Sequence, residues 1–362
     1  MSRVFNFGAG PAMLPREVME KAQAEFLDYN GIGASIVEIS HRSKDFDAIV
    51  DACDELIYEL SGVPKNYKLL YVHGGARMQF SAMPMNLLPR SESGKMLYFE
   101  TGNFAKLAHQ EAAKYGEVQV VASGKETGYD RIPDYDPAVF NQDAAYVHIT
   151  SNNTLYGTRW NEFPKTGDIP LVADMTSELF SRQLDFSQFG AVYAGFQKNL
   201  GPSGTALVMI REDLLGNAMP TTPTLLDYAD YAKSHSMSNT ISTFNMYILK
   251  LVLEWKKAQG GIAALEARNE QKSGILYDVL DNSDFYVPVA HKDHRSTMNV
   301  TFNLKNNDLL DSFLKQALAE GLYALKGHRA VGGVRASIYN AMPVEGCQAL
   351  ADFMVEFERT NG

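Results

Sequence analysis

The chain has 362 residues, 45% of them hydrophobic, which is enough to bury a large core in about two domains. Its 43 Asp and Glu against 33 Lys and Arg give a net charge of −10. This argues against binding nucleic acid or an anionic membrane, since both rely on a positive field. Two cysteines, Cys53 and Cys347, are too few for a disulfide framework or a zinc site, and both fit apolar positions of predicted helices. The N-terminus carries no long apolar segment or cleavage site, and no run approaches a membrane span, so we expect a soluble, reduced, cytoplasmic protein.

Helical patterns and short apolar runs alternate through the first part of the chain. Apolar residues between positions 46 and 60 recur at helical spacing, and Ser61–Gly62 ends that helix. Further helical patterns cover 77–88 and 103–115. Runs of strand length lie at 69–73, 96–99, 117–121, 145–150, 171–174, 191–194 and 205–210. Several of these runs are apolar on both faces, which indicates a parallel sheet with helices on either side. We therefore predict an α/β fold with a doubly wound, mostly parallel sheet, whose ligands bind at the carboxyl ends of the strands.

The pattern changes after a long helix at 243–259, which Gly260–Gly261 ends. Helices at 261–281, 308–321 and 345–359 then combine with strands at 298–304 and 334–339. This indicates a smaller α+β unit of about a hundred residues. We predict a large domain over 16–260 and a small domain made of 1–15 and 261–362.

A lysine and an aspartate follow two of the predicted strands. Lys198 lies between an apolar run and a glycine-rich turn, and Asp174 ends the run at 171–174. Pyridoxal phosphate (PLP) needs such a pair, because a lysine forms its Schiff base and a carboxylate keeps its pyridine nitrogen protonated. Taken alone, the pair also fits a solvated surface lysine and a strand-ending turn residue.

Two further segments suit a phosphate group. His73-Gly74-Gly75-Ala76-Arg77 joins a strand to a helix start, where free amides and the helix dipole attract anions. A purely structural Gly-Gly turn explains these residues equally well. Ser238-Asn239-Thr240 offers polar donors before a long helix, although simple helix capping also accounts for it.

Basic residues form three clusters in this acidic chain. Arg42 follows His41, Arg329 follows His328, and Arg335 lies just after Gly332–Gly333. Such groups among glycines indicate sites for carboxylates and phosphates, although each one alone would fit an exposed surface. The pair His291 and His294 lies in a polar stretch that is typical of a solvated loop, and we predict no metal site. Dinucleotide, P-loop, zinc-protease and serine-hydrolase motifs are absent.

Long runs of the sequence resemble the phosphoserine aminotransferase family of the class-V aminotransferases. They lie at 6–15, 40–42, 73–77, 193–202, 211–216, 324–329 and 332–343. The resemblance covers essentially the whole chain. It implies fold type I of the PLP enzymes and a homodimer with its two active sites at the subunit interface. It also implies the reaction, in which glutamate gives its amino group to 3-phosphohydroxypyruvate and forms O-phosphoserine for serine synthesis.

The resemblance also assigns roles to individual residues. Lys198 corresponds to the Schiff-base lysine and Asp174 to the partner of the pyridine nitrogen. Phe104 corresponds to an aromatic residue, often Trp, that stacks on the cofactor ring, and Thr154 lies near the phenolic oxygen. The phosphate cradle corresponds to Ala76, Arg77 and Gln197, together with Asn239 and Thr240 from the other subunit. The substrate-anion residues correspond to His41, Arg42, Arg77, His328, Arg329 and Arg335. The sequence departs from the family at Ala9, where many members have serine, and at Asn153, where glutamate is usual.

Three alternatives share the scaffold or the cofactor. A cysteine desulfurase needs a reactive cysteine on a mobile loop, whereas Cys347 falls on a predicted helix. An alanine–glyoxylate type of aminotransferase has a substrate too small to use the basic clusters. A non-catalytic PLP-binding protein would not need the pair Lys198 and Asp174, since storage requires no electron sink. The residues do not decide whether the phosphorylated hydroxythreonine precursor of vitamin B6 (pyridoxine) is also a substrate.

Overall fold

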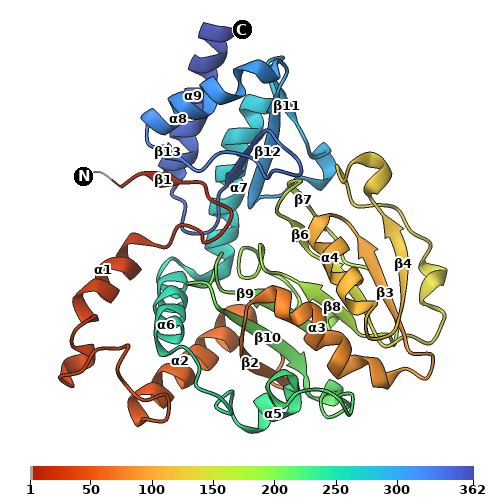
Figure 1. The fold of residues 1–362 in the computed structure, drawn as a ribbon. Helices are drawn as coiled ribbons and strands as arrows, with labels where there is room; N and C mark the ends of the chain where they lie inside the picture. The colour runs from red at the N-terminus through yellow and green to blue at the C-terminus, as the bar shows by residue number, and fades with distance from the viewer. Residues whose placement is uncertain (1–2) are drawn as a thin grey trace.

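The computed structural model describes residues 3–362, and a seven-stranded sheet forms its centre (Figure 1). The strand order is β2-β10-β9-β8-β5-β3-β4, and only β10 runs antiparallel to its neighbours. The strands are β2 (Tyr67–His73), β3 (Lys95–Glu100), β4 (Glu117–Ser123), β5 (Val147–Thr150), β8 (Leu171–Asp174), β9 (Ala191–Gly195) and β10 (Thr205–Arg211). The predicted α/β class with a mostly parallel sheet is confirmed.

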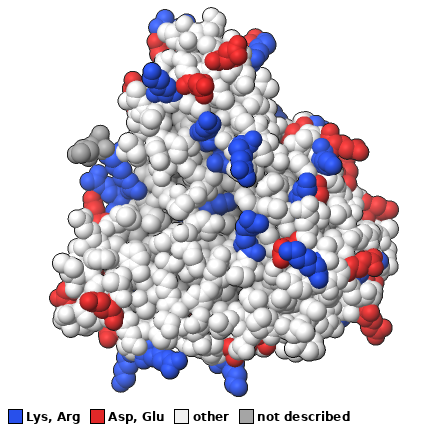
Figure 2. All heavy atoms as spheres, in the orientation of Figure 1, with Lys and Arg blue, Asp and Glu red and all other residues white. Residues whose placement is uncertain are grey.

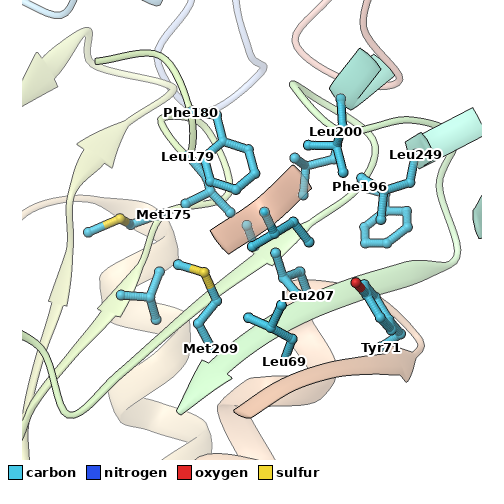
Figure 3. Close-up of a cluster of buried hydrophobic side chains, with 14 of the residues drawn as sticks. Leu69, Tyr71, Met175, Leu179, Phe180, Phe196, Leu200, Leu207, Met209 and Leu249 are labelled. Atoms are coloured by element: carbon cyan, nitrogen blue, oxygen red, sulfur yellow. The ribbon is translucent and has the colours of Figure 1, made fainter. Parts of the chain in front are cut away.

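Both faces of the sheet are apolar because alternate residues of each strand enter different cores. Leu69 and Tyr71 of β2 belong to the core beneath α2 and α6, whereas Leu70 and Val72 belong to the core beneath α3, α4 and α5. Figure 3 shows Leu69 and Tyr71 packed beside Leu207 in the first of these cores. The helices are α1 (Arg16–Glu25), α2 (Lys44–Ser61), α3 (Ala76–Leu87), α4 (Asn103–Ala112), α5 (Tyr228–Lys233) and α6 (Thr243–Ala258).

Helix α2 shows how local signals determine an element. The Ser43 side chain accepts a hydrogen bond from the amide of Phe46 and caps the first turn. Gly62 ends the helix in the left-handed region at φ +65°, where a side chain would be strained, and its amide bonds to the carbonyl of Tyr58. The predicted helix stop at Ser61–Gly62 is confirmed.

The C-terminal part has its own sheet and core. Strands β11 (Tyr286–Pro288), β12 (Asn299–Leu304) and β14 (Val334–Ser337) pair in antiparallel fashion in that order. The core of this part includes Phe302, Phe313 and Met354. The helices of this part are α7 (Gly261–Asp281), α8 (Leu310–Ala319) and α9 (Val344–Asn361).

The N-terminal segment lies against this C-terminal part (Figure 1). Strand β1 (Phe5–Asn6) pairs in parallel with β13 (Leu322–Tyr323), and Phe7 is buried in the C-terminal core. Helix α7 spans two cores, because Leu265 packs under the large sheet and Leu276 packs in the C-terminal core. The boundary at 260–261 stays a prediction, and residues 1 and 2 of the predicted small domain lie outside the described residues.

Sequence patterns missed the ten-residue helix α1 and several short elements: α5, β1, β11, β13 and the hairpin of β6 (Asn152–Asn153) and β7 (Thr158–Arg159). A strand of two or three residues is too short to show a period, so pairing alone defines it. Cys53 and Cys347 are buried free thiols in α2 and α9, as predicted, and burial raises the pKa of both. Within residues 3–362, every helix is too short or too polar to cross a membrane.

Candidate active site

A cavity of about 540 Å³ lies at the carboxyl ends of β8 and β9. Ligands of doubly wound sheets bind at this edge. Basic side chains gather near the centre of the face shown in Figure 2, between the sheet and the C-terminal part. The predicted site residues that line the cavity are Ala76, Arg77, Phe104, Thr154, Asp174, Gln197, Lys198, His328 and Arg335.

Lys198 lies three residues beyond the end of β9, in a buried turn. Its Nζ donates a hydrogen bond of 2.7 Å to Thr154 Oγ1. Burial lowers the pKa of Lys198 to about 8, with Asp174 opposing this shift and Arg335 adding to it. About a tenth of the amine is therefore neutral at pH 7, far more than at the ordinary pKa of 10.5, which suits a nucleophile or a base.

Asp174 is the last residue of β8 and is also buried. Its Oδ1 accepts a 2.9 Å hydrogen bond from the amide of Thr176. Burial raises the pKa of Asp174, although the bonds from Thr176 and the charge of Lys198 favour the ionised form. Among residues 3–362 this carboxylate forms no ion pair, so the site can accept a cationic partner beside it.

The turn before α3 presents backbone amides to the cavity. Gly74 and Gly75 have φ values of +87° and +75°, which only glycine adopts without strain, and α3 begins at Ala76. The amides of Ala76 and Arg77 belong to the first helical turn and have no intrahelical acceptor. This end of the helix can therefore hold a phosphate.

Aromatic and basic groups approach the cavity from other elements. The ring centre of Phe104, in α4, lies 5.7 Å from Lys198 Nζ. Arg335, in β14, is partly buried, and its Nε has no hydrogen-bond partner within the described chain. Burial lowers the pKa of Arg335 and of His328, and the charges of Arg335 and Arg329 lower that of His328 further. An anionic ligand would satisfy the unpartnered guanidinium.

Five predicted residues do not line the cavity of one chain: His41, Arg42, Asn239, Thr240 and Arg329. The first two precede α2, the next two precede α6, and Arg329 is exposed beside His328. Their roles, like those of the lining residues, stay predictions.

Other lining residues were missed from the sequence, among them Gly10, Asn152, Thr176 and Ser177. Gly10 has φ +146°, and a Cβ there would lie 3.7 Å from Lys198 Cγ, so its loop passes close to the lysine. Thr176 lies only two residues after Asp174, and this closeness in the sequence could have identified it as a residue of the site. Asn152 and Ser177 carried no such signal, because their hydrogen bond of 2.9 Å joins β6 to the turn after β8, 25 residues away in the chain.

Asn153, which departs from the family pattern, is buried beside the cavity. Its side chain accepts from Thr101 Oγ1 at 3.0 Å and donates to Thr158 Oγ1 at 3.1 Å. The neutral amide is thus satisfied locally and holds the β6–β7 hairpin that leads to Thr154.

Comparisons with known proteins agree with this geometry. The model of the class-V aminotransferases matches residues 4–350. A phosphoserine aminotransferase of Geobacillus kaustophilus is 51% identical over 360 residues, with 99% of each chain covered. The structure of phosphoserine aminotransferase from Bacillus circulans subsp. alkalophilus matches with a TM-score of 0.95 and 43% identity, covering 99% of each chain. PLP-bound phosphoserine aminotransferase from Trichomonas vaginalis matches with a TM-score of 0.93 and 34% identity, covering 98% of this chain and 100% of that one.

The predicted resemblance is therefore confirmed along the whole length of the chain. A lysine, an aspartate and a helix start meet in one cavity of a fold that these aminotransferases share. This chain belongs to the class-V aminotransferase family, and within it to the phosphoserine aminotransferases.

Proposed function

We propose that this chain is a PLP-dependent aminotransferase that exchanges an amino group between glutamate and 3-phosphohydroxypyruvate, giving 2-oxoglutarate and O-phosphoserine. This is a step of serine biosynthesis. One observation carries the proposal: buried Lys198 and Asp174 line the same cavity as Arg335. The chain that holds this cavity is similar over its full length to a phosphoserine aminotransferase.

The residues present fit the cofactor. Lys198 supplies a partly neutral amine, and Asp174 supplies a buried carboxylate that lacks an ion-pair partner within the described chain. The start of α3 offers free amides for a phosphate, with Arg77 at the rim, and Gln197 lines the same cavity. The Phe104 ring offers an aromatic face, and the Thr154 hydroxyl lies at the lysine.

When bound, PLP supplies an electron sink that stabilises negative charge at the substrate Cα. Lys198 Nζ would act as the base that takes the proton from that carbon and delivers it to the cofactor carbon, and the second half of the reaction would move a proton in the opposite direction. Burial suits Nζ to both tasks, because a pKa of about 8 leaves protonated and neutral forms within reach near neutral pH.

Asp174 acts at a different atom. With the cofactor bound, the Asp174 carboxylate would keep a proton on the pyridine nitrogen, and that cation would favour the ionised form of Asp174 against the burial that raises its pKa. Thr176 fixes the orientation of the carboxylate through its amide.

Arg335 and His328 bind the acidic groups of the substrates. One site must accept the γ-carboxylate of glutamate and the phosphate of phosphoserine in turn. A guanidinium pairs with either oxyanion, and the unpartnered Arg335 Nε is available for this contact. We infer the same role for Arg329, which adjoins His328 at the surface.

A second copy of the chain completes the site in this proposal. His41, Arg42, Asn239 and Thr240 stay outside the cavity of their own protomer. In a homodimer with shared sites, these residues would reach the cavity of the neighbouring protomer and add its phosphate and substrate contacts. The free buried thiols of Cys53 and Cys347 support a cytoplasmic location.

The test is spectroscopic. The holoenzyme should show a visible absorption band that glutamate bleaches and 3-phosphohydroxypyruvate restores. Lys198→Ala should abolish turnover while circular dichroism shows a retained fold. A folded Lys198→Ala variant that converted phosphoserine and 2-oxoglutarate at the normal rate would refute the assignment.

A further inference from the structure

Three consecutive backbone carbonyls, of residues 179–181, are each held by a different buried asparagine. Asn199 Nδ2 donates to the carbonyl of Leu179 at 3.3 Å. Asn340 Nδ2 donates to that of Phe180 at 2.7 Å. Asn269 Nδ2 donates to that of Ser181 at 2.9 Å. We call these three residues the asparagine clamp.

The clamp residues are also bonded to one another. The amide of Asn340 donates to Asn199 Oδ1 at 3.1 Å, and Asn269 Nδ2 donates to Asn340 Oδ1 at 2.8 Å. All three are at most 5% exposed. A network so deeply buried exchanges little with water, and each bond in it fixes geometry more firmly than a surface contact does.

Each member comes from a different part of the chain. Asn199 directly follows Lys198, Asn269 lies in α7, and Asn340 lies three residues beyond the end of β14, the strand that carries Arg335. The clamped carbonyls lie a few residues after Asp174. Because the amides of Glu178 and Leu179 both bond to the carbonyl of Met175, the segment from Asp174 to Ser181 is a tight turn. The clamp therefore joins the three segments that supply Lys198, Asp174 and Arg335.

The clamped segment is held in an unfavourable conformation. Phe180 has φ +59°, which is unusual for a residue with a side chain. Its ring and the side chain of Leu179 point into the core beside Leu200 (Figure 3). Strained backbone persists only where the surroundings over-determine it, and here the core holds the ring while Asn340 holds the carbonyl.

A buried lysine fixes the strand side of the clamp. Lys272 Nζ donates to the carbonyls of Ile338 and Tyr339, at 2.8 Å each. Tyr339 in turn donates from its hydroxyl to the carbonyl of Ala9 at 3.0 Å, and its ring centre lies 6.0 Å from Lys198 Nζ. The chain around Asn340 is thus held on both sides, and it adjoins the cavity.

We propose that Asn340 is a positioning residue, which fixes Lys198 and Asp174 relative to Arg335 through the asparagine clamp. The proposal rests on the proposed function in taking Lys198 as the reactive amine. Reacting groups lose much of their rate when they shift by about 1 Å, so the clamp should affect turnover more than its contribution to stability alone would.

The competing explanation is that the clamp serves stability only, as any buried amide network does. Asn86 in α3 provides a matched control. It is also buried, donates to the carbonyls of Ala82 and Leu226 at 2.8 and 2.7 Å, and accepts from the amide of Tyr228 at 2.9 Å. It does not line the cavity. Asn86→Ala therefore removes a comparable set of bonds away from the site.

The experiment compares Asn340→Ala and Asn86→Ala in the holoenzyme and the apoenzyme. Both variants should lose a similar amount of thermal stability. Only Asn340→Ala should lose kcat, by about 10- to 100-fold, with a smaller change in KM. In the apoenzyme, the rate at which an amine-directed reagent labels Lys198 should be measured against pH by mass spectrometry. The midpoint should rise by about one pH unit in Asn340→Ala, because a loosened turn admits water to the amine, and it should stay unchanged in Asn86→Ala.

Equal kcat and equal labelling midpoints in the two variants would overturn the positioning role and leave the proposed function intact. Failure of the proposed function has a different signature, namely turnover by folded Lys198→Ala. If Asn340→Ala does not fold, Asn199→Ala serves in its place, because it removes the bond to Leu179 and the acceptor for the amide of Asn340. Asn199→Ala should show the same loss of kcat and the same rise of the labelling midpoint. If its kcat and midpoint equalled those of the Asn86→Ala control, the proposal would be overturned.

Discussion

Lys198 Nζ and Thr154 Oγ1 are joined by a hydrogen bond of 2.7 Å. The contact connects the turn after β9 to the β6–β7 hairpin, and its two residues lie 44 positions apart in the chain. It holds the amine inside the cavity, where burial lowers its pKa to about 8. An amine kept in this state is reactive, and its burial also costs folding free energy.

The first prediction concerns that cost. Because the pKa of Lys198 falls from 10.5 in the unfolded chain to about 8, the unfolded state binds more protons between these values. The destabilisation that results from burying Lys198 is therefore absent above pH 10.5. It grows as the pH falls from 10.5 to 8 and is complete below about pH 8. Lys198→Met should stabilise the apoenzyme at neutral pH by about 2 to 3 kcal/mol and abolish turnover. Thermal unfolding at neutral pH and near pH 10.5 measures this, and a gain that is equal at both values would contradict the explanation.

Asp174→Asn should lower kcat by about 10² to 10³, which is typical of losing one preorganised electrostatic partner. The Asn side chain still has an oxygen that can accept the hydrogen bond from the backbone N–H of Thr176. It carries no negative charge that could hold a proton on the pyridine nitrogen. Steady-state kinetics measures the loss. Asp185→Asn, at an exposed acid that only caps a short turn, is the control and should retain normal kcat. Normal turnover by Asp174→Asn would remove this role.

Site sharing between protomers predicts complementation. Lys198→Ala and the double variant Asn239→Ala/Thr240→Ala should each be inactive or nearly so alone. After unfolding and refolding together, about a quarter of the sites should be intact, because half of the random dimers are mixed and each has one complete site. Mixing Lys198→Ala with Asp174→Asn should restore nothing, since both residues line the cavity of the same chain. Equal results from the two mixtures would exclude shared sites.

Arg42 and Arg329 should control phosphate recognition. Arg42→Gln and Arg329→Gln should raise KM for phosphoserine at least tenfold, because each removes a charge-assisted bond to an oxyanion. KM for glutamate should change less, since its carboxylate carries less charge than a phosphate. Competition between phosphoserine and serine measures the preference directly. An unchanged preference for phosphoserine in both variants would show that other residues bind the phosphate.

The buried side chain of His148 should make the protein less stable in acid. It lies buried in β5, with its Nε2 2.8 Å from the Tyr193 hydroxyl and its ring stacked 4.7 Å from that of Tyr98. Burial lowers the pKa of His148 from 6.5 to about 3, so the unfolded state binds the extra proton between these values and stability falls as the pH falls from 6.5. At about pH 5 the loss should be about 2 kcal/mol. In His148→Gln, the free energy of unfolding, measured with urea at a series of pH values, should fall less steeply between pH 6.5 and pH 5 than in the unaltered protein. An equally steep fall with pH in both proteins would contradict the mechanism.

Much of the large sheet was predictable from local patterns. The predicted strand at 171–174 matches β8, and the predicted helix at 261–281 matches α7. Runs that are apolar on both faces specify a buried strand wherever they lie, because each face meets its own core. Short elements such as β6 and β13 carry too few residues for a period, and only their partners define them.

The candidate active site was likewise predictable from the sequence only in part. The sequence by itself determined the reactive types, since Lys198 beside a glycine-rich turn and Asp174 at a strand end are visible in the printed chain. The family resemblance assigned Thr154 and Arg335 to the site, but local patterns did not determine that Thr154 bonds to Lys198, that Arg335 lines the same cavity, or that Asn340 holds the carbonyl of Phe180. Only the tertiary structure decided these contacts, because each joins residues far apart in the chain, and no local pattern encodes which distant side chain satisfies a buried polar group.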